Sequence, residues 1–410
     1  MPPADLRIGI VGFGHRAQLR HDVHRPGSGS VVSAVLDIAE RGRRDAREAL
    51  PSALVTDDLG TFLASGVDGA LVLTPDDRHR DIAVALLEAG IPVFCEKPLA
   101  ITLADADAIL YAAHRTGTRL YVGHNMRHMP VITLMRQLIA DGTIGDVKAV
   151  WCRHFVGHGG DYYFKDWHSD RSRTTGLLLQ KGAHDIDVIH WLAGARTVRV
   201  NAMGALAVYG EVTDRSNHEG ERMEDWVSLD NWPPTAQTGL APVIDVEDIS
   251  QMNMLLANGV LASYQQCHFT PDYWRNYTVI GTEGRLENWG DELGAEVRVW
   301  SHRSQGMGVP DEVYPVPELD PDAVHGGADA LLIDEFLRFI SEGGDTETSP
   351  VAARDAVAAG IAATASLRDG GSARRVPALP PHVVAYFENG QQTPSLELDI
   401  AFARAHRDGR

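Results

Sequence analysis

A glycine-rich turn between two apolar strands constrains this chain more than any other feature. The segment Gly12-Phe13-Gly14-His15-Arg16-Ala17 follows the apolar run 6–11, and a second apolar run, 31–37, ends in a carboxylate. Glycines at the first two positions let the backbone leave a strand sharply and approach a pyrophosphate, which then binds the amides that open the next helix. In this context the pattern predicts a dinucleotide site that includes Gly12, Phe13, Gly14, His15 and Arg16.

Asp37, at the end of the second strand, bears on which dinucleotide binds. A carboxylate there accepts hydrogen bonds from both hydroxyls of the adenosine ribose and repels a 2′-phosphate. We therefore expect NAD in preference to NADP. Arg41, Arg43 and Arg44 lie just beyond and could hold a 2′-phosphate, but arginines on the first turns of a helix more often form a solvated face.

Length and charge restrict the class of protein and its partners. A chain of 410 residues exceeds one ordinary core and predicts two domains or more. The net charge of -19 argues against nucleic acid and against an anionic membrane as partners. The three cysteines show no paired spacing, which fits a reducing compartment. With no apolar run of about 18 residues and a first strand that begins at Leu6, we expect a cytoplasmic protein.

Residues 1–124 alternate short apolar strands with amphipathic helical patterns. The helical patterns fall at 58–64, 78–89 and 103–114, and the strands at 6–11, 31–37, 69–74, 92–95 and 119–123. Such alternation with short connections predicts a doubly wound, parallel Rossmann sheet, whose ligands gather beyond the carboxyl ends of the strands. We expect residues 1–124 to form the NAD-binding domain.

The character of the chain changes after this domain. A helical pattern at 131–140 is followed by strand patterns at 147–156, 198–208, 249–256, 260–269, 277–281 and 297–301. Asn258-Gly259 predicts a hairpin with a type I′ turn, because both residues tolerate positive φ angles. We therefore expect residues 125–376 to form an α+β domain for substrate binding and oligomerisation, with a large, open and mostly antiparallel sheet.

Four further segments complete the predicted organisation. Residues 210–241 are acidic, polar and contain proline, which predicts a long surface insertion with little regular structure. Helical patterns follow at 327–340 and 351–367. Residues 377–410 are expected to form a C-terminal tail.

Polar side chains gather on one predicted helix, residues 176–194. At helical spacing Gln180, His184 and Asp187 project to one side, and Lys181 is a neighbour of His184 at i,i+3. Burying such groups in a core without partners is costly, which favours a polar cleft. A hydrogen-bonded core histidine is the alternative interpretation of His184.

Lys97, directly after the strand 92–95, is a candidate acid/base group. Oxidation of a secondary alcohol requires a group that takes the hydroxyl proton while hydride leaves the same carbon. An ammonium near a positively charged nicotinamide is destabilised relative to the neutral amine, which suits that task. A surface ion pair with Glu96 is the alternative. We hypothesise that Lys97 and His184 share the proton transfer and that Lys181 tunes them or takes part.

Residues 154–170 are dense in glycine, histidine, tyrosine and tryptophan, which suits recognition of a sugar. Tyr163, Trp167 and His168 could stack on a polyol ring or bond its hydroxyls, and Asn125 and Arg127 are similar candidates. Packing for structural reasons is the alternative for this loop.

A metal site is the competing use of the histidines in this half of the chain. Their spacings match no ligand signature, and neither a cysteine nor a paired glutamate accompanies them. We therefore expect no bound metal at His154, His158, His168, His184 or His190.

At Glu96-Lys97-Pro98 the chain begins to resemble the Gfo/Idh/MocA family of NAD(P)-dependent oxidoreductases that act on sugars and cyclitols. Further matches are Thr74-Pro75-Asp76 with His79, Gly123-His124-Asn125 with Arg127, Gly142-Thr143-Ile144-Gly145, His184-Asp185-Ile186-Asp187, Val246-Glu247-Asp248, Asn258-Gly259 and Gly281-Thr282-Glu283-Gly284. The resemblance spans roughly residues 6–370.

The resemblance implies roles for individual residues. Lys97 would be the catalytic lysine, aimed by a cis Pro98, and Glu96 would bind the ribose next to the nicotinamide. His184 would be the second catalytic group, with Asp187 binding substrate or orienting that histidine. On the cofactor side it adds Thr74, Pro75, Asp76 and His79. One departure concerns Gln180, which stands where many members carry an aspartate and which cannot accept a proton. The resemblance also implies a homo-oligomer.

The sequence as a whole predicts an NAD-dependent dehydrogenase that oxidises one secondary hydroxyl of a sugar, sugar derivative or inositol. One alternative keeps the cofactor but uses transient oxidation to allow β-elimination of a glycosidic bond, with NAD regenerated in each cycle. Another is a non-catalytic regulator that binds NAD.

Overall fold

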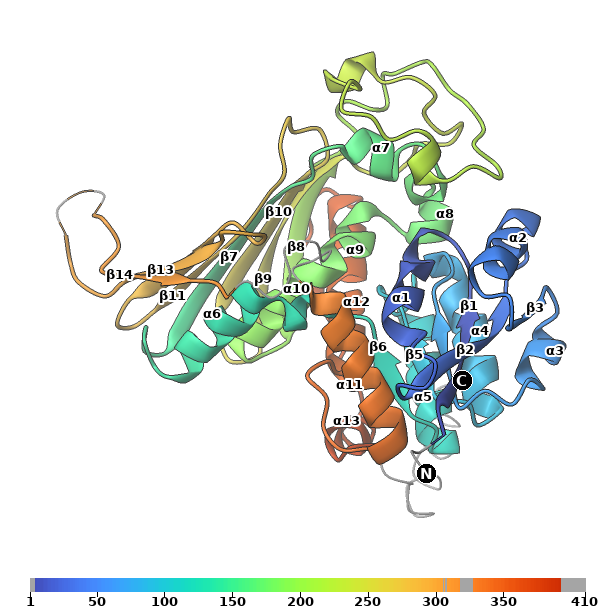
Figure 1. The fold of residues 1–410 in the computed structure, drawn as a ribbon. Helices are drawn as coiled ribbons and strands as arrows, with labels where there is room; N and C mark the ends of the chain where they lie inside the picture. Colours follow the sequence, from blue (N-terminus) through green and yellow to red (C-terminus); the bar gives the residue numbers. More distant parts are fainter. Residues whose placement is uncertain (1–3, 305, 307, 318–326, 392–410) are drawn as a thin grey trace, which may run out of the picture. The chain divides into compact units, whose positions relative to one another are not determined.

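Two β-sheets organise the part of the chain that this computed structural model describes, residues 4–304, 306, 308–317 and 327–391 (Figure 1). The first compact unit comprises the described residues of Met1–Gly123, Leu332–Arg354 and Ala378–Arg410. The second comprises those of His124–Leu331 and Asp355–Pro377. Residues 392–410, most of the predicted tail, lie outside the described part.

The first unit contains a six-stranded sheet in the order β3-β2-β1-β4-β5-β6, with every neighbouring pair parallel. Its strands are β1 Leu6–Val11, β2 Ser30–Leu36, β3 Leu54–Thr56, β4 Gly69–Val72, β5 Val93–Cys95 and β6 Leu120–Val122. The order reverses between β1 and β4, which is where ligands bind in doubly wound sheets. The predicted Rossmann sheet is confirmed, and β3 is an additional edge strand.

Short helices connect these strands. They are η1 His15–Leu19, α1 Arg20–Val23, α2 Glu40–Ala49, α3 Leu59–Leu63, η2 Asp76–Arg78, α4 His79–Glu88 and α5 Leu103–Thr116. Their ends follow local chemistry: Asp58 and Thr102 accept hydrogen bonds from the third residues of α3 and α5, and α5 ends at Gly117 with φ +67°.

Segments from the end of the chain complete the first unit. In α11, Ala328–Glu342, the side chains of Leu332, Phe336 and Phe339 join the core that contains Ile8 and Ile10 of β1. After α13, Pro381–Glu388, the side-chain amide of Gln391 bonds both the N–H and the C=O of Leu120, at 2.8 Å each. That contact satisfies main-chain groups of the edge strand β6.

The second unit contains a nine-stranded sheet in the order β14-β13-β12-β11-β7-β10-β9-β8-β15. The strands are β7 Val147–Phe155, β8 Thr197–Ala205, β9 Ile249–Leu256, β10 Leu261–Cys267, β11 Trp274–Gly281, β12 Arg285–Trp289, β13 Glu296–Trp300, β14 Glu312–Pro315 and β15 Arg374–Arg375. Only the β7–β10 pair is parallel. The predicted open, mostly antiparallel sheet is confirmed.

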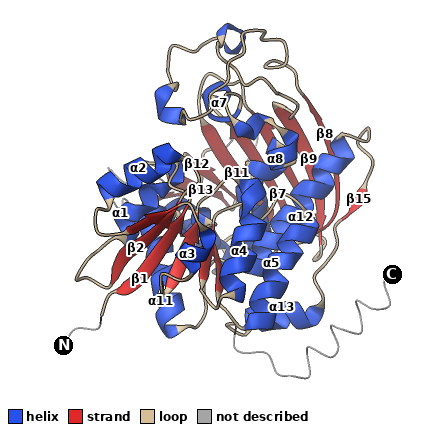
Figure 2. Cartoon of the chain, turned by 90° about the vertical axis from the view of Figure 1, so that its right-hand side faces the viewer, coloured by secondary structure: helices blue, strands red, loops and turns tan. Residues whose placement is uncertain are grey.

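Side chains along these strands alternate between a covered and an exposed face. In β7, Val150, Cys152 and His154 are buried whereas Trp151 and Arg153 are exposed. Helix α10, Gly182–Ala193, packs on β7 and β10 on the covered face, and Figure 2 shows strands β7, β8, β9 and β11 of this sheet. Helices α6 Pro130–Ala140, α9 Leu177–Gln180 and α12 Pro350–Leu367 complete the major helices. One face of the sheet therefore remains open.

Two local predictions for the second unit were wrong in detail. The predicted helix 176–194 is interrupted at Lys181, which ends α9 and precedes α10. The hairpin between β9 and β10 forms, but of its two turn residues only Gly259 has a positive φ, +85°. The turn is therefore not type I′. The side chain of Asn258 instead donates to the carbonyl of Ala193 at 2.8 Å, which holds the turn against the end of α10.

The insertion 210–241 is largely irregular, as predicted, with the short turns η5 Met223–Asp225 and η6 Pro234–Ala236. It is nevertheless anchored. Its Val212 and Leu240 are buried in one core with Phe164 and Tyr209. Asp161, in α7 Gly159–Tyr163, accepts hydrogen bonds from the insertion and from Lys165; the insertion donors are Asn231 at 2.6 Å and Gln237 at 3.2 Å.

Candidate active site

The glycine-rich turn leaves β1 in a conformation that requires glycine. Gly12 has φ +91°, and a Cβ there would lie 2.9 Å from the carbonyl oxygen of Leu73. Gly14 precedes η1, and no described atom lies within 4 Å of the place that its Cβ would take. Phe13 between them is buried in the core. The turn therefore combines a fixed backbone with open space at Gly14, which is what close approach of a pyrophosphate needs.

Asp37 lies against this turn. Its Oδ2 accepts from the main-chain N–H of Phe13 at 2.6 Å, and its Oδ1 accepts from that of Ala39 at 2.7 Å. A Cβ on Gly42 would lie 2.3 Å from Oδ2, so α2 passes close to the carboxylate. A carboxylate has about four acceptor sites, so Asp37 retains capacity for ribose hydroxyls.

The side chain of Arg43, one of the arginines that could hold a 2′-phosphate, bonds the segment just before its own helix α2. Its Nη1 donates to the carbonyls of Asp37 and Ile38 at 3.0 and 2.9 Å, and its Nη2 pairs with Glu40. The guanidinium is therefore committed to main-chain and carboxylate acceptors. Ile38 itself is 85% exposed.

Glu96, after β5, links two of the predicted cofactor segments. Its buried carboxylate pairs through Oε1 with Nε of Arg16, and its Oε2 accepts from the main-chain N–H of Lys97 at 2.8 Å. The Lys97-Pro98 peptide bond is cis, as the family resemblance implies. The side chain of Lys97 is half-buried.

His79 connects the loops that follow β4 and β5. It is fully buried, with Nδ1 2.8 Å from the carbonyl of Pro98 and Nε2 3.0 Å from that of Thr74. Burial lowers the pKa of His79, so the neutral ring donates to one carbonyl at a time. This position makes His79 a support for the segments around Thr74-Pro75-Asp76 and Lys97-Pro98.

A buried ion pair involves a residue near the start of the second unit. Arg127, in η3 Asn125–His128, donates to both oxygens of Asp187, at 2.7 and 2.8 Å. Nδ1 of His124 lies 3.1 Å from the same carboxylate. Burial alone would raise the pKa of Asp187, but the charge of Arg127 and the contacts with Arg127 and His124 hold it well below its usual range. Asn125, also buried, donates to Asp329 at 2.9 Å.

A second buried cluster lies between α10 and the covered face of the sheet. Asp185 contacts Nδ1 of His154 at 3.0 Å, Nε of Arg275 at 3.2 Å and the hydroxyl of Tyr277. Burial lowers the pKa of His154 to about 3. Burial would raise the pKa of Asp185, but Arg275 and His154 reverse that shift. The cluster therefore holds the ionised carboxylate of Asp185 between α10 and the covered face of the sheet.

Lys181 lies at the break between α9 and α10, next to this cluster. Burial, together with the charge of Arg275, lowers the pKa of Lys181 to about 8. Its Nζ lies 5.7 Å from the centre of the Tyr163 ring. This shift brings the amine closer to the range in which acid/base groups work, and the role of Lys181 stays a prediction.

Three of the predicted sugar-recognition residues lie together, and one of them, Tyr163, is the neighbour of Lys181. The ring of Tyr163 lies 5.4 Å from that of His168, and Trp167 stacks on His168 with a centroid distance of 3.8 Å. Residues 167–169 form η4 Trp167–Ser169, and α8 Arg171–Thr174 follows. Gln180 is buried and His184 is half-buried. The second unit thus brings Tyr163, Trp167 and His168 together near Lys181, and separately pairs Arg127 with Asp187.

Three polar residues of the second unit were missed by sequence reasoning: His124, His268 and Arg275. His268 is fully buried, and its ring lies 5.1 Å from that of Tyr163. Burial and the charge of Lys181 lower the pKa of His268 to about 3. The alternation of buried and exposed residues along a strand could have indicated Arg275, because Arg275 and Tyr277 both lie on the covered face of β11. For His124 the only signal was its place in the motif that Asn125 and Arg127 share.

Three further findings concern metal ions, membranes and cavities. Across the described ranges, no group of three histidine, cysteine, aspartate or glutamate side chains is arranged to hold a metal ion. No helix in the same ranges has the length and apolar character to cross a membrane. Two shallow cavities, of about 180 and 470 Å³, lie on the second sheet and contain none of the predicted site residues.

Comparison with known proteins identifies relatives for both halves of the chain. A family model described as an oxidoreductase family with an NAD-binding Rossmann fold matches residues 6–124, and the model of the GFO/IDH/MocA C-terminal domain matches residues 132–287. The chain is 32% identical over 263 residues to 1,5-anhydro-D-fructose reductase of Ensifer adhaerens, covering 64% of this chain and 69% of that protein.

Two further proteins extend the comparison. The chain is 32% identical over 211 residues to myo-inositol dehydrogenase Hyg17 of Streptomyces leeuwenhoekii, covering 51% of this chain but only 62% of that protein. A levoglucosan dehydrogenase solved with NADH and levoglucosan superposes with a TM-score of 0.73 at 20% identity, over 91% of this chain and all of that one. At this identity the structural match shows the fold alone.

Proposed function

Because this chain belongs to the Gfo/Idh/MocA family of oxidoreductases, with an NAD-binding Rossmann domain, we propose that it is a dehydrogenase that oxidises one secondary hydroxyl of a sugar, sugar derivative or inositol. The observation that supports this proposal is the position of Lys97, just after β5 and next to Glu96, whose carboxylate accepts from the main-chain N–H of Lys97. Relatives named for inositol and anhydrofructose chemistry support the substrate class.

The residues of the first unit fit NAD. The cradle at Gly12 and Gly14 would receive the pyrophosphate, and Asp37 would bind the adenosine ribose. Glu96 would bind the other ribose, in contact with Arg16. When bound, NAD supplies the acceptor for the hydride.

The chain's own task is then to take the hydroxyl proton. Lys97 and His184 would share it, and Lys181, with its pKa of about 8, would tune His184 or accept the proton in part. Tyr163, Trp167 and His168 would bind the sugar ring and its hydroxyls. Asn125 and Gln180 remain substrate candidates, whereas Arg127 and Asp187, which bond each other, would shape the site from behind.

A substrate panel tests this function. Purified protein is mixed with NAD and with pyranoses, anhydrosugars and inositols, and NADH is followed by its absorbance. Net NADH with one class identifies a dehydrogenase. Cleavage of a glycoside with retained cofactor and no net NADH would instead identify a redox-neutral glycosidase. Absence of turnover across the panel would leave a regulator that binds NAD.

The Asp37 carboxylate gives a prediction about cofactor choice. Asp37→Ala is expected to raise the KM for NAD at least about tenfold, because charged hydrogen bonds to the ribose are lost, and to improve the use of NADP. Steady-state kinetics with both cofactors measure this. Glu40→Gln, which alters an exposed carboxylate at the start of α2, is the control. Equal or better use of NADP by the wild type would contradict the assignment.

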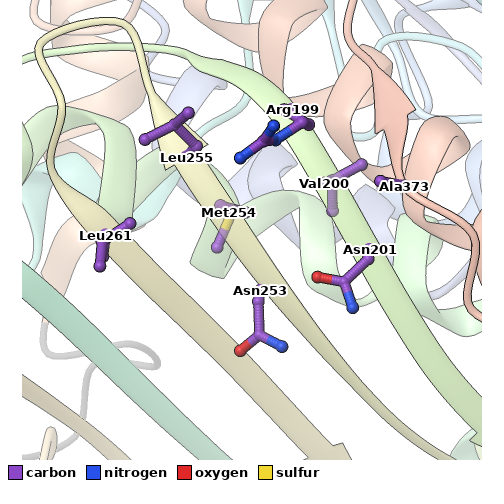
Figure 3. A pocket seen from close by; sticks show the side chains of 8 residues that line it. All are labelled: Arg199, Val200, Asn201, Asn253, Met254, Leu255, Leu261 and Ala373. Atoms are coloured by element: carbon purple, nitrogen blue, oxygen red, sulfur yellow. The ribbon is translucent and has the colours of Figure 1, made fainter.

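We further propose that the protein is a homo-oligomer that buries the open face of the second sheet. Apolar side chains project from that face on neighbouring strands: Trp151 is 51% exposed, Leu261 62% and Met203 59%. Figure 3 shows part of this face, where Asn201 of β8 lies opposite Asn253 of β9 beside Leu255 and Leu261. An apolar surface of this kind is typical of interfaces between protein subunits.

The double substitution Trp151→Lys with Leu261→Lys is expected to convert the oligomer to a monomer, because charges would be buried without partners. Sedimentation velocity or light scattering after gel filtration measures the change. Leu229→Lys, at an 81% exposed position in the insertion, should leave the assembly intact. A wild-type protein that is monomeric at micromolar concentrations would refute the proposal.

A further inference from the structure

A buried imidazole in the second unit has no assigned task. His124, the residue after the first unit ends, is 2% exposed. Its Nδ1 lies 3.1 Å from Oδ2 of Asp187. Its Nε2 is enclosed and has no hydrogen-bond partner among the described residues. A buried polar atom of this kind is rare in folded proteins and often belongs to a functional site.

The contact with Asp187 decides which ring nitrogen of His124 carries a hydrogen. Both carboxylate oxygens accept from Arg127, and its charge holds the pKa of Asp187 well below the usual range despite burial. An ionised carboxylate can only accept, so Nδ1 of His124 carries the hydrogen. Nε2 is therefore left with a lone pair. A carboxylate that orients an imidazole in this way also stabilises the imidazolium when the ring gains a proton.

His184 is the neighbour of this imidazole. The two ring centres are 6.2 Å apart and the planes are inclined by 43°. This separation suits proton exchange through one bridging oxygen. The titratable side chains in contact with His124 are Asp187 and His184, both from α10, and Arg127 of η3 bonds the same Asp187 carboxylate. Gln180, at the position where an aspartate would assist His184, cannot accept a proton.

We propose that His124, oriented by Asp187, accepts through His184 the proton that leaves the substrate hydroxyl. The inference rests on the proposed dehydrogenase function. In this step the substrate O–H bond breaks and its proton passes to His184, which releases a proton to Nε2 of His124. NAD, when bound, would supply the acceptor for the hydride of the same carbon, so that the substrate is left with a carbonyl. His124 ends as an imidazolium paired with the Asp187 carboxylate, so His124 is a positioning and relay residue.

The test combines kinetics with a measurement that is independent of turnover. His124→Gln keeps polar contacts but cannot take a proton, and it is expected to lower kcat about 10- to 100-fold, with the pH profile of kcat changed and the KM for NAD kept. Free imidazole should restore part of the activity of His124→Ala. Nitrogen NMR of labelled histidine should show a ring with protonated Nδ1 and bare Nε2 in the wild type, and this signal should be missing from His124→Gln.

The control is His190→Gln, which changes a buried histidine of α10 that bonds Thr197. It should leave the pH profile unchanged. If the wild type oxidises a substrate but His124→Gln has the same kcat and pH profile, the relay alone is wrong. A loss of activity that is equal at every pH and is not restored by imidazole indicates a structural role and also overturns it. If the wild type oxidises nothing in the panel, both the function and the relay fail.

Discussion

Replacing Lys97 by alanine is expected to lower kcat by about 10²- to 10⁴-fold while the Kd for NADH stays nearly unchanged. The amine would interact with the reacting oxygen in the transition state, so its loss removes stabilisation of that state rather than of the bound cofactor. The contact that holds Glu96 uses the main-chain N–H of Lys97, which alanine retains. The substitution therefore separates chemistry from cofactor binding.

Steady-state kinetics give kcat, and quenching of NADH fluorescence gives Kd. Lys148→Ala is a matched control, because this lysine is exposed in β7 with only a 3.4 Å contact to Asp146. It should change neither quantity. Wild-type kcat in Lys97→Ala would reject the catalytic role. A loss of NADH affinity as large as the loss of kcat would instead make Lys97 a cofactor ligand.

The free energy of unfolding is expected to fall steeply below pH 6.5. Burial lowers the pKa of His154 and His268 to about 3 and that of His190 to about 4, from an ordinary value of 6.5. Below pH 6.5 these three histidines bind protons in the unfolded chain but stay unprotonated in the folded protein. Stability is therefore complete above pH 6.5 and is lost as the pH falls toward the folded pKa values.

Each such histidine contributes a slope of about 1.4 kcal/mol per pH unit, and the three together about 4 kcal/mol per pH unit. Since a whole domain is stable by about 5–15 kcal/mol, we expect loss of the second unit's structure near pH 5. Urea unfolding followed by tryptophan fluorescence at pH 7, 6 and 5 measures the slope. His190→Asn should reduce the slope by the contribution of one proton, about 1.4 kcal/mol per pH unit. An unfolding free energy that is flat from pH 7 to 5 would contradict this prediction.

Features that depend on neighbouring residues in the chain were predictable. The strand β1 and the turn at Gly12 could be recognised because a buried parallel strand is continuously apolar and only glycine tolerates the turn's φ angle. The hairpin at Asn258-Gly259 was recognised too, but its turn type was wrong. There the side chain of Asn258 bonds Ala193, a partner 65 residues away that no local preference encodes.

The polar site depends more on distant partners. Lys181 was chosen from its place on a predicted helix, but its lowered pKa comes from burial and from Arg275, which β11 contributes. Arg275 in β11 and His268, which directly follows β10, were missed because their burial depends on which face of the sheet α10 covers. The predicted roles of Lys97 and His184 stay predictions, which the substitutions above address.

The sequence by itself determined the order of strands and helices, the glycine-dependent turn and the carboxylate that favours NAD, because backbone preference and side-chain periodicity act over a few residues. Only the tertiary structure decided which polar groups meet. Asp187 bonds Arg127 from 60 positions earlier, and residues 332–354 join the core of the first unit. Such pairings are set by burial and charge compensation between segments far apart in the chain, so local sequence patterns do not predict them.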